Sequence, residues 1–424
     1  MRRPPYARPA SYQNRVFFTG SQLYSRFPLI EESSEKKRSF NAPLIRIITI
    51  LIILQNSWSL DILRRRFRIL KIHSGKRRRV RSIEDLTLAR PMKILSFLVK
   101  TLLIAFLFAY LIVRAARGSA FSELQLNAFS FKLLFVSLIF NLGATCVTII
   151  RWRALVQALD EPLSLSDAFR FGFIGFMFNL SPVGIAGGDA IKVYLLAQKT
   201  KTPLDKATAS VIMDRVVGLY SMFILGLIAL FSTGFYRRSE PLAQLTTKGL
   251  IALTAAATVF LAFVLFPASP QSRRIKLAQS LPIVGGFMSK LANATLFYQK
   301  RKKTLYLSFV ATFVVHLSFA VSLFFIARGL FFKSPTLVDH IILYCSGNVG
   351  SIIPLSAGPL EYFLDELYPL FPITDAESFQ HGYGMTIGIA YRMTTIAVAL
   401  IGVFYYLISL ADVKKALRSP KESV

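Results

Sequence analysis

Little of this chain is charged, and very little of that charge is acidic. Only 17% of its 424 residues are charged, against about 25% in an average soluble domain. The chain has 22 Asp and Glu beside 51 Lys and Arg, and 54% of its residues are hydrophobic. This composition argues against an ordinary soluble protein and favours one whose surface faces lipid.

Cysteine and histidine are also scarce. The two cysteines, Cys146 and Cys345, both lie in apolar surroundings, and the four histidines are scattered along the chain. Neither a disulfide framework nor a metal site is indicated by such a pattern. The chain contains no phosphate-binding Walker A loop, no H-E-x-x-H and no G-x-S-x-G. We therefore expect no metal, no cofactor and no ATPase activity that would drive the protein.

Hydrophobic runs of about 20 residues are abundant, and this is the length that a helix needs to cross a bilayer. They predict six full spans, near 94–113, 131–150, 211–231, 247–267, 305–330 and 385–410. Two further apolar stretches, 168–198 and 338–370, are interrupted by proline and glycine and are expected to form re-entrant or broken helices. The predicted fold class is an all-α polytopic membrane protein.

The two interrupted stretches share a pattern, in which an acidic residue follows a proline by seven positions. The residues that form it are Pro182, Gly187, Gly188 and Asp189 in the first stretch and Pro354, Gly358 and Glu361 in the second. At membrane depth, irregular backbone persists only where protein buries it or where it lines a watery cavity. Two such segments in corresponding places point to the substrate site of a transporter.

The glycines of this pattern allow two interpretations. Backbone N–H groups of Gly187, Gly188 and Gly358 could bind an anion at a helix N-terminus. The same glycines could instead allow two helices to pack closely. The residues alone favour neither interpretation.

An arginine inside a predicted span follows each interrupted stretch. Arg215 lies 26 residues after Asp189, with Asp214 beside it, and Arg392 lies 31 residues after Glu361. An arginine at this depth costs several kcal/mol and needs a carboxylate or an anionic ligand. One interpretation is a pair of structural salt bridges, Asp214–Arg215 and Glu361–Arg392. The other is that the arginines bind a phosphate through their planar, two-pronged side chains.

The distribution of charge predicts the orientation of the chain. The net charge of +29 could indicate a nucleic-acid ligand, but 20 of the Lys and Arg precede residue 92, and most others lie in loops on one predicted side. This is the positive-inside pattern of membrane proteins, so no nucleic acid is expected. Segment 268–304 has eight basic residues and no acid, which predicts a cytoplasmic loop. Segment 333–384 has six acids and one lysine, which predicts an exterior position.

Three full spans separate the two interrupted stretches, so the stretches are expected to open on opposite sides of the membrane. This arrangement predicts an inverted repeat, which is typical of alternating-access transporters.

The chain divides into a basic N-terminal extension, 1–91, a transmembrane domain, 92–412, and a basic cytoplasmic tail, 413–424. Two interpretations of the extension remain open. It is either an arm that lies on anionic headgroups or an untranslated segment upstream of a start at Met92.

The order of these elements resembles that of a known family. The sequence Arg151-Trp152-Arg153, the Gly-Gly-Asp and Asp-Arg elements, and the later Pro354…Gly358…Glu361 resemble the transmembrane region of lysylphosphatidylglycerol synthases over roughly 92–410. Stand-alone relatives are called flippase-like. One departure is Ser356-Ala357-Gly358-Pro359, where the family usually has a Pro-Gly-Gly type of turn.

The resemblance implies a translocase in the cytoplasmic membrane that moves a phospholipid or a lipid-linked headgroup between leaflets. The ligand would be a lipid with an anionic headgroup, and a lipid-modifying or glycosyl transferase would be a candidate partner. Bifunctional relatives carry a C-terminal aminoacyl-transferase domain, whereas this chain stops shortly after its last span, so we do not expect an enzyme. The alternative function is a non-transporting accessory subunit of a lipid or glycan transferase.

Overall fold

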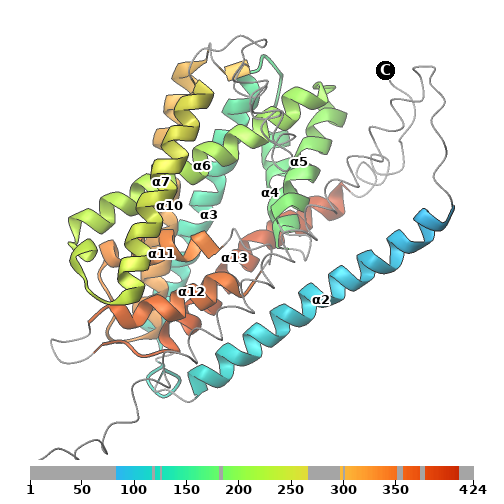
Figure 1. Cartoon of the computed structure of the whole chain (residues 1–424). Coiled ribbons are helices and arrows are strands. Elements are labelled where there is room, and N and C mark those ends of the chain that lie inside the picture. Colours follow the sequence, from blue (N-terminus) through green and yellow to red (C-terminus); the bar gives the residue numbers. More distant parts are fainter. Residues whose placement is uncertain are drawn as a thin grey trace, which may run out of the picture. The chain divides into compact units, whose positions relative to one another are not determined.

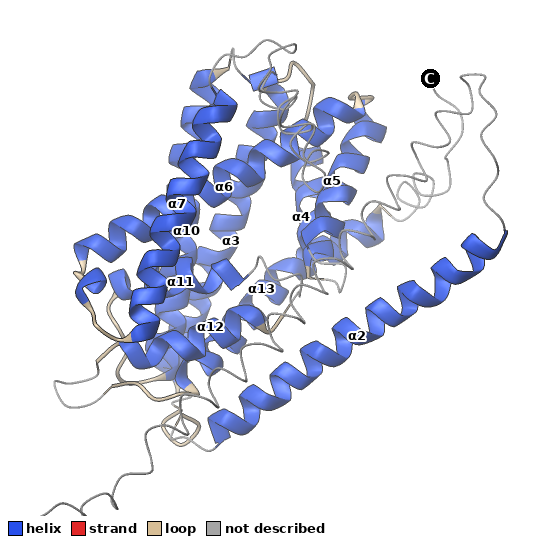
Figure 2. Ribbon diagram, viewed as in Figure 1, coloured by secondary structure: helices blue, strands red, loops and turns tan. Residues whose placement is uncertain are grey.

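The computed structural model describes residues 83–116, 120–124, 127–180, 185–265, 297–298, 301–350, 357–372 and 378–409. Pro182, Pro354, most of the N-terminal extension and the tail 413–424 lie outside these residues. The described part is helical and contains no β-strand, as Figure 2 shows.

Five helices are long and apolar enough to cross a membrane, and they match five of the predicted spans (Figure 1). They are α3 (Ala128–Gln157), α6 (Leu204–Ser232), α7 (Pro241–Leu265), α10 (Lys302–Leu330) and α13 (Tyr383–Ile408). The sixth prediction falls in α2 (Ile83–Ala116), whose residues Thr101–Ala116 form an apolar stretch. The helix α2 begins nine residues before Met92 and so runs through the boundary expected there. The predicted all-α polytopic membrane fold is confirmed.

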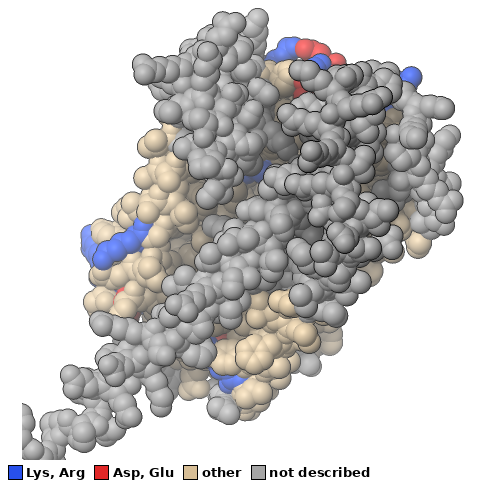
Figure 3. Space-filling model, turned by 45° about the vertical axis from the view of Figure 1, so that its right-hand side comes forward, with Lys and Arg blue, Asp and Glu red and all other residues tan. Residues whose placement is uncertain are grey.

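The outward faces of these helices carry large apolar side chains. Phe106 of α2, Phe135 of α3 and Phe404 of α13 are among the exposed ones. In the space-filling view the described surface is mostly tan, with blue and red atoms in small, separated groups (Figure 3). In water such faces would be costly, whereas against lipid tails they are not.

Both interrupted stretches form pairs of short helices. The first hairpin consists of α4 (Leu165–Asn179) and α5 (Ile185–Thr200), and the second of α11 (Leu337–Val349) and α12 (Pro359–Leu367). With 9 to 16 residues each, these helices are roughly 14–24 Å long, too short to cross a core of about 30 Å. The prediction of broken helical segments is confirmed.

Glycine determines how closely the helices of the first hairpin pack. A Cβ atom on Gly188 of α5 would collide with the carbonyl oxygen of Gly175 in α4 and with Oδ1 of Asn179. Gly347 of α11 packs similarly against Leu360 of α12. At Gly188, therefore, the structure supports the close-packing interpretation.

Replacing Gly188 by alanine is expected to destabilise the protein by about 1–3 kcal/mol, because the added methyl group meets backbone that cannot move aside. Thermal unfolding in detergent would measure the loss. Gly143 of α3 is the control, because nothing lies within 4 Å of a Cβ placed there. Equal unfolding temperatures for Gly188→Ala and Gly143→Ala would contradict the close packing.

The helices α3 and α10 pack side by side in opposite directions. Gly329, near the end of α10, packs against the carbonyl oxygen of Ser130, near the start of α3. Further along the pair, Ser137 Oγ and Ser322 Oγ share a hydrogen bond of 2.9 Å. This antiparallel pair gives the described bundle two distinct ends.

The two hairpins open at opposite ends of that pair. Near the C-terminal end of α3, Arg153 Nε donates a 2.9 Å hydrogen bond to the carbonyl oxygen of Leu163, just before α4. At the other end, Arg238, which follows α6, donates to the carbonyl oxygen of Leu370, which follows α12. The first hairpin therefore enters where α3 ends and α6 begins, and the second where α6 ends.

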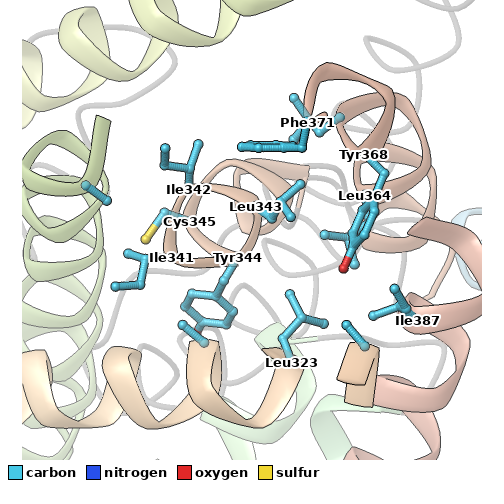
Figure 4. Packing of buried hydrophobic residues seen from close by; sticks show 14 of the residues in the cluster. Leu323, Ile341, Ile342, Leu343, Tyr344, Cys345, Leu364, Tyr368, Phe371 and Ile387 are labelled. Atoms are coloured by element: carbon cyan, nitrogen blue, oxygen red, sulfur yellow. The ribbon is translucent and has the colours of Figure 1, made fainter. Parts of the chain in front are cut away.

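Each hairpin also packs on a helix from the other half of the chain. A Cβ atom on Gly402 of α13 would meet the carbonyl oxygen of Phe173 in α4, and one on Gly226 of α6 would meet Cβ of Cys345 in α11. Around α11 the core is dense: Figure 4 shows Leu323 of α10, Leu364 of α12 and Ile387 of α13 surrounding it. These contacts fix the hairpins against the long helices.

Candidate functional site

Arg215 of α6 pairs with Asp189 of α5. The guanidinium donates from Nε to Oδ2 at 2.8 Å and from Nη2 to Oδ1 at 2.7 Å, which is a two-pronged salt bridge. The Arg215 side chain is 41% exposed and that of Asp189 is 19% exposed. Arg215 lies eleven residues after the start of α6, roughly 16 Å along the helix axis. This pair therefore lies well inside a helix that is long and apolar enough to span a membrane, and it remains accessible.

Arg392 of α13 pairs with Glu361 of α12 in the same manner. Nε donates to Oε1 at 2.8 Å and Nη2 to Oε2 at 3.2 Å. Glu361 is fully buried, and its Oε2 also accepts a 2.8 Å hydrogen bond from the backbone N–H of Gly358. Gly358 has a φ of 101°, which disfavours any residue with a side chain. Glu361 thus caps its own helix while it neutralises Arg392.

The expected pair Glu361–Arg392 is present, but the expected pair Asp214–Arg215 is not. Neighbouring residues of a helix point about 100° apart, so Arg215 turns towards α5 and Asp214 turns towards α3. There Arg151 donates from Nε to Asp214 Oδ1 at 3.0 Å, and Nη2 lies 2.8 Å from the same oxygen. Arg151 Nη1 also donates to Thr312 Oγ1 of α10 at 2.5 Å.

Lys192 of α5 completes this group. Its Nζ lies 3.9 Å from Asp214 Oδ2 and 4.4 Å from the centre of the Trp152 ring. It also interacts electrostatically with Asp189. We refer to Arg151, Asp189, Lys192, Asp214 and Arg215 as the first cluster, and to Glu361 and Arg392 as the second cluster.

Sequence reasoning missed Arg151 and Lys192 as members of the site. The Arg151-Trp152-Arg153 element suggested the end of a span at residue 150, whereas α3 continues to Gln157 and carries Arg151 inside the bundle. For Lys192 the available signal was its position three residues after Asp189, which places both side chains on one face of α5.

The remaining predicted site residues, glycines and prolines of the hairpins, lie outside the two clusters of charged residues or outside the described part of the chain. Gly187 lies in the first turn of α5, and Gly188 forms the hairpin contact described above. Pro182 and Pro354 fall outside the described residues. Within the described part of the chain, no group of three or more His, Cys, Asp and Glu could hold a metal ion.

Several residues of the two hairpins correspond at a separation of 172 positions. This separation relates Pro182 to Pro354, Gly175 to Gly347 and Asp189 to Glu361. The arginines of α6 and α13 then meet these acids in equivalent two-pronged salt bridges. The two clusters are therefore built on equivalent parts of the chain.

Comparison with known families agrees with this arrangement. The family described as the lysylphosphatidylglycerol synthase TM region matches residues 94–402. The chain belongs to this family. The match includes both hairpins and both clusters, and it confirms the resemblance inferred from the motifs. No curated protein and no solved structure matches the chain.

Proposed function

We propose that this integral membrane protein is a lipid translocase that moves a phospholipid or a lipid-linked headgroup between leaflets. One observation carries the proposal: each half holds an arginine–carboxylate pair deep in the membrane, between a hairpin and the following span. Burying one such pair is costly, and two equivalent ones suit a ligand that meets both halves in turn. Membership of a lipid-related membrane family supports the same conclusion.

In this proposal a headgroup phosphate competes with a carboxylate for an arginine. Both acids already use the two parallel N–H groups that a phosphate would take. When the phosphate binds, the carboxylate and its hairpin are released from the long helix. The lipid tails stay among the bilayer tails while the headgroup passes along the protein.

We further propose that the halves form an inverted repeat that exposes the two clusters alternately. The hairpins open at opposite ends of the α3–α10 pair, as alternating access requires. The end that holds Arg153, Lys206 and Arg301 would face the cytoplasm, by the positive-inside rule. The C-terminus would lie on that side, in the cytoplasmic membrane.

Single cysteines in a protein lacking Cys146 and Cys345 would test this orientation. Lys201→Cys and Lys302→Cys are expected to react with an impermeant maleimide only after the cells are permeabilised. Glu240→Cys and Lys333→Cys are expected to react in intact cells, and all four positions are exposed. If Lys201 and Glu240, which flank α6, became labelled from the same side, the inverted arrangement would be wrong.

The proposed ligand is a membrane lipid with an anionic headgroup, and the protein would move this lipid without modifying it. A lipid-modifying or glycosyl transferase would supply or consume the transported molecule. No nucleic-acid partner is proposed, because the membrane orientation accounts for the basic loops.

Reconstitution would test the proposed activity. Full-length protein is placed in liposomes with a trace of phosphatidylglycerol labelled on an acyl chain, and dithionite bleaches the label in the outer leaflet. Bleaching beyond the outer half, absent from protein-free liposomes, is the expected result. Bleaching that stops at the outer half would overturn the proposal and favour a non-transporting accessory subunit.

A further inference from the structure

The first cluster does not balance its charge. It contains three cations, Arg151, Lys192 and Arg215, and two carboxylates, Asp189 and Asp214. With every group ionised, its net charge is +1. The tip of the first hairpin, 181–184, contains no charged residue that could correct the difference.

The second cluster is balanced. Glu361 and Arg392 neutralise each other. The position equivalent to Lys192 is Leu364, 172 residues later, and the residue before Arg392 is Tyr391, where Asp214 precedes Arg215. The repeat therefore retains one salt bridge in both halves and adds a lysine and a second ion pair only to the first.

The two clusters also differ in accessibility. The Arg215 side chain is 41% exposed, whereas that of Arg392 is 19% exposed. Asp189 is 19% exposed, whereas Glu361 is fully buried and also bonded to the N–H of Gly358. Among the described residues, Nη1 of Arg215 makes no hydrogen bond. The first cluster therefore offers a ligand both an accessible donor and an excess of positive charge.

An uncompensated cation in a medium of low dielectric constant is costly, and a single negative charge placed beside it removes that cost. We propose that the first cluster is the high-affinity site for a headgroup of net charge −1, such as the phosphodiester of an anionic phospholipid, with Lys192 as the residue that selects for this charge. The proposal rests on the proposed function only for the identity of the ligand as a lipid.

This difference gives the two halves distinct roles. A monoanionic headgroup binds tightly at the first cluster, where it neutralises Lys192, and weakly at the second, where the charges already balance. A zwitterionic headgroup adds no net charge to either cluster, so it gains nothing from Lys192.

Calorimetric titration of full-length protein in a non-ionic detergent would test the selectivity. The probes are dihexanoyl phosphatidylglycerol, of net charge −1, and dihexanoyl phosphatidylcholine, of net charge 0, both kept below their micelle concentrations. Wild-type protein is expected to bind phosphatidylglycerol about tenfold or more tightly than phosphatidylcholine. Equal affinities of the wild-type protein for the two lipids would overturn the proposal.

Variants then assign the selectivity to one side chain. Lys192→Met should reduce the affinity for phosphatidylglycerol to that for phosphatidylcholine, whereas Lys192→Arg should retain the preference. Leu364→Met, at the equivalent position, is the control and should behave as wild type. A preference that persists in a folded Lys192→Met protein would exclude Lys192 as the selecting residue.

Transport is measured separately, so the two proposals fail separately. Selective binding without dithionite-detected transport would leave the charge-selective site standing and remove the translocase. Transport by a protein that binds the two probes equally would leave the translocase standing and remove the charge-selective site.

Discussion

Replacing Arg215 by lysine is expected to reduce lipid transport in reconstituted liposomes by about tenfold or more, while the protein still inserts and folds. Lysine keeps the positive charge beside Asp189, so the cost of a stranded carboxylate does not arise. It cannot offer two parallel N–H groups to one phosphate, however, and this geometry is what the proposed mechanism needs. Arg392→Lys is expected to have the same effect, because its pairing with Glu361 is equivalent.

The matched control is Arg301→Lys. Arg301 also forms a salt bridge, with Asp160, in which its Nη2 contacts both carboxylate oxygens, but that pair is exposed and lies just before the start of α10. Transport should be unchanged in this variant. A well-expressed Arg215→Lys protein with normal transport would show that Arg215 is a structural partner of Asp189 and not a phosphate ligand.

Replacing Asp214 by asparagine is expected to cause the largest loss of stability, about 3–5 kcal/mol, because it leaves buried cations without their carboxylate. Arg151 and Lys192 both depend on Asp214, and all three side chains are at least nine-tenths buried. Thermal unfolding in detergent would show the effect. Asp160→Asn is the control, since removing an exposed partner should change the stability by about 1 kcal/mol or less.

Removing all three charges distinguishes stranded charge from lost packing. Arg151→Met and Lys192→Met combined with Asp214→Leu should regain most of the stability lost in Asp214→Asn, because neither buried cation is then left without its carboxylate. If the triple variant were as unstable as Asp214→Asn, the cost would come from packing and not from electrostatics.

Much of the fold was predictable because the bilayer limits the choices. Runs of about 20 apolar residues have few alternatives to a spanning helix. Five predicted spans match helices long enough to cross a membrane, and the sixth overlaps the shorter apolar stretch Thr101–Ala116 of α2. The hairpins were predictable from Pro182 and Pro354, since a span cannot continue through such a break without other partners. The ends of the helices were less predictable: α3 continues through the basic Arg151-Trp152-Arg153 element, because Arg151 finds a partner inside the protein.

The pairing within the site could be predicted only in the second half. Glu361 is the acid that follows Pro354 by seven positions and Arg392 is the arginine inside the next span, so their pairing was one of the two interpretations of the sequence. In the first half, five charged residues allow several pairings, and proximity in sequence favoured Asp214–Arg215. Asp214 and Arg215 point in different directions around α6, towards α3 and α5 respectively, so they do not pair. The positions of α3 and α5 beside α6 cannot be predicted from the local sequence.

The contacts between the halves have a consequence for how such a chain could arise. Each hairpin packs on long helices of its own half and also on one long helix of the other half, α13 for the first hairpin and α6 for the second. A single half, cut from the chain, would keep its own contacts but expose the face that the other half covers. If the halves are inverted copies, as we propose, an ancestral half-length protein would have covered that face with a second copy in the opposite orientation. Joining the two copies through α7 would then have fixed their opposite orientations in one chain.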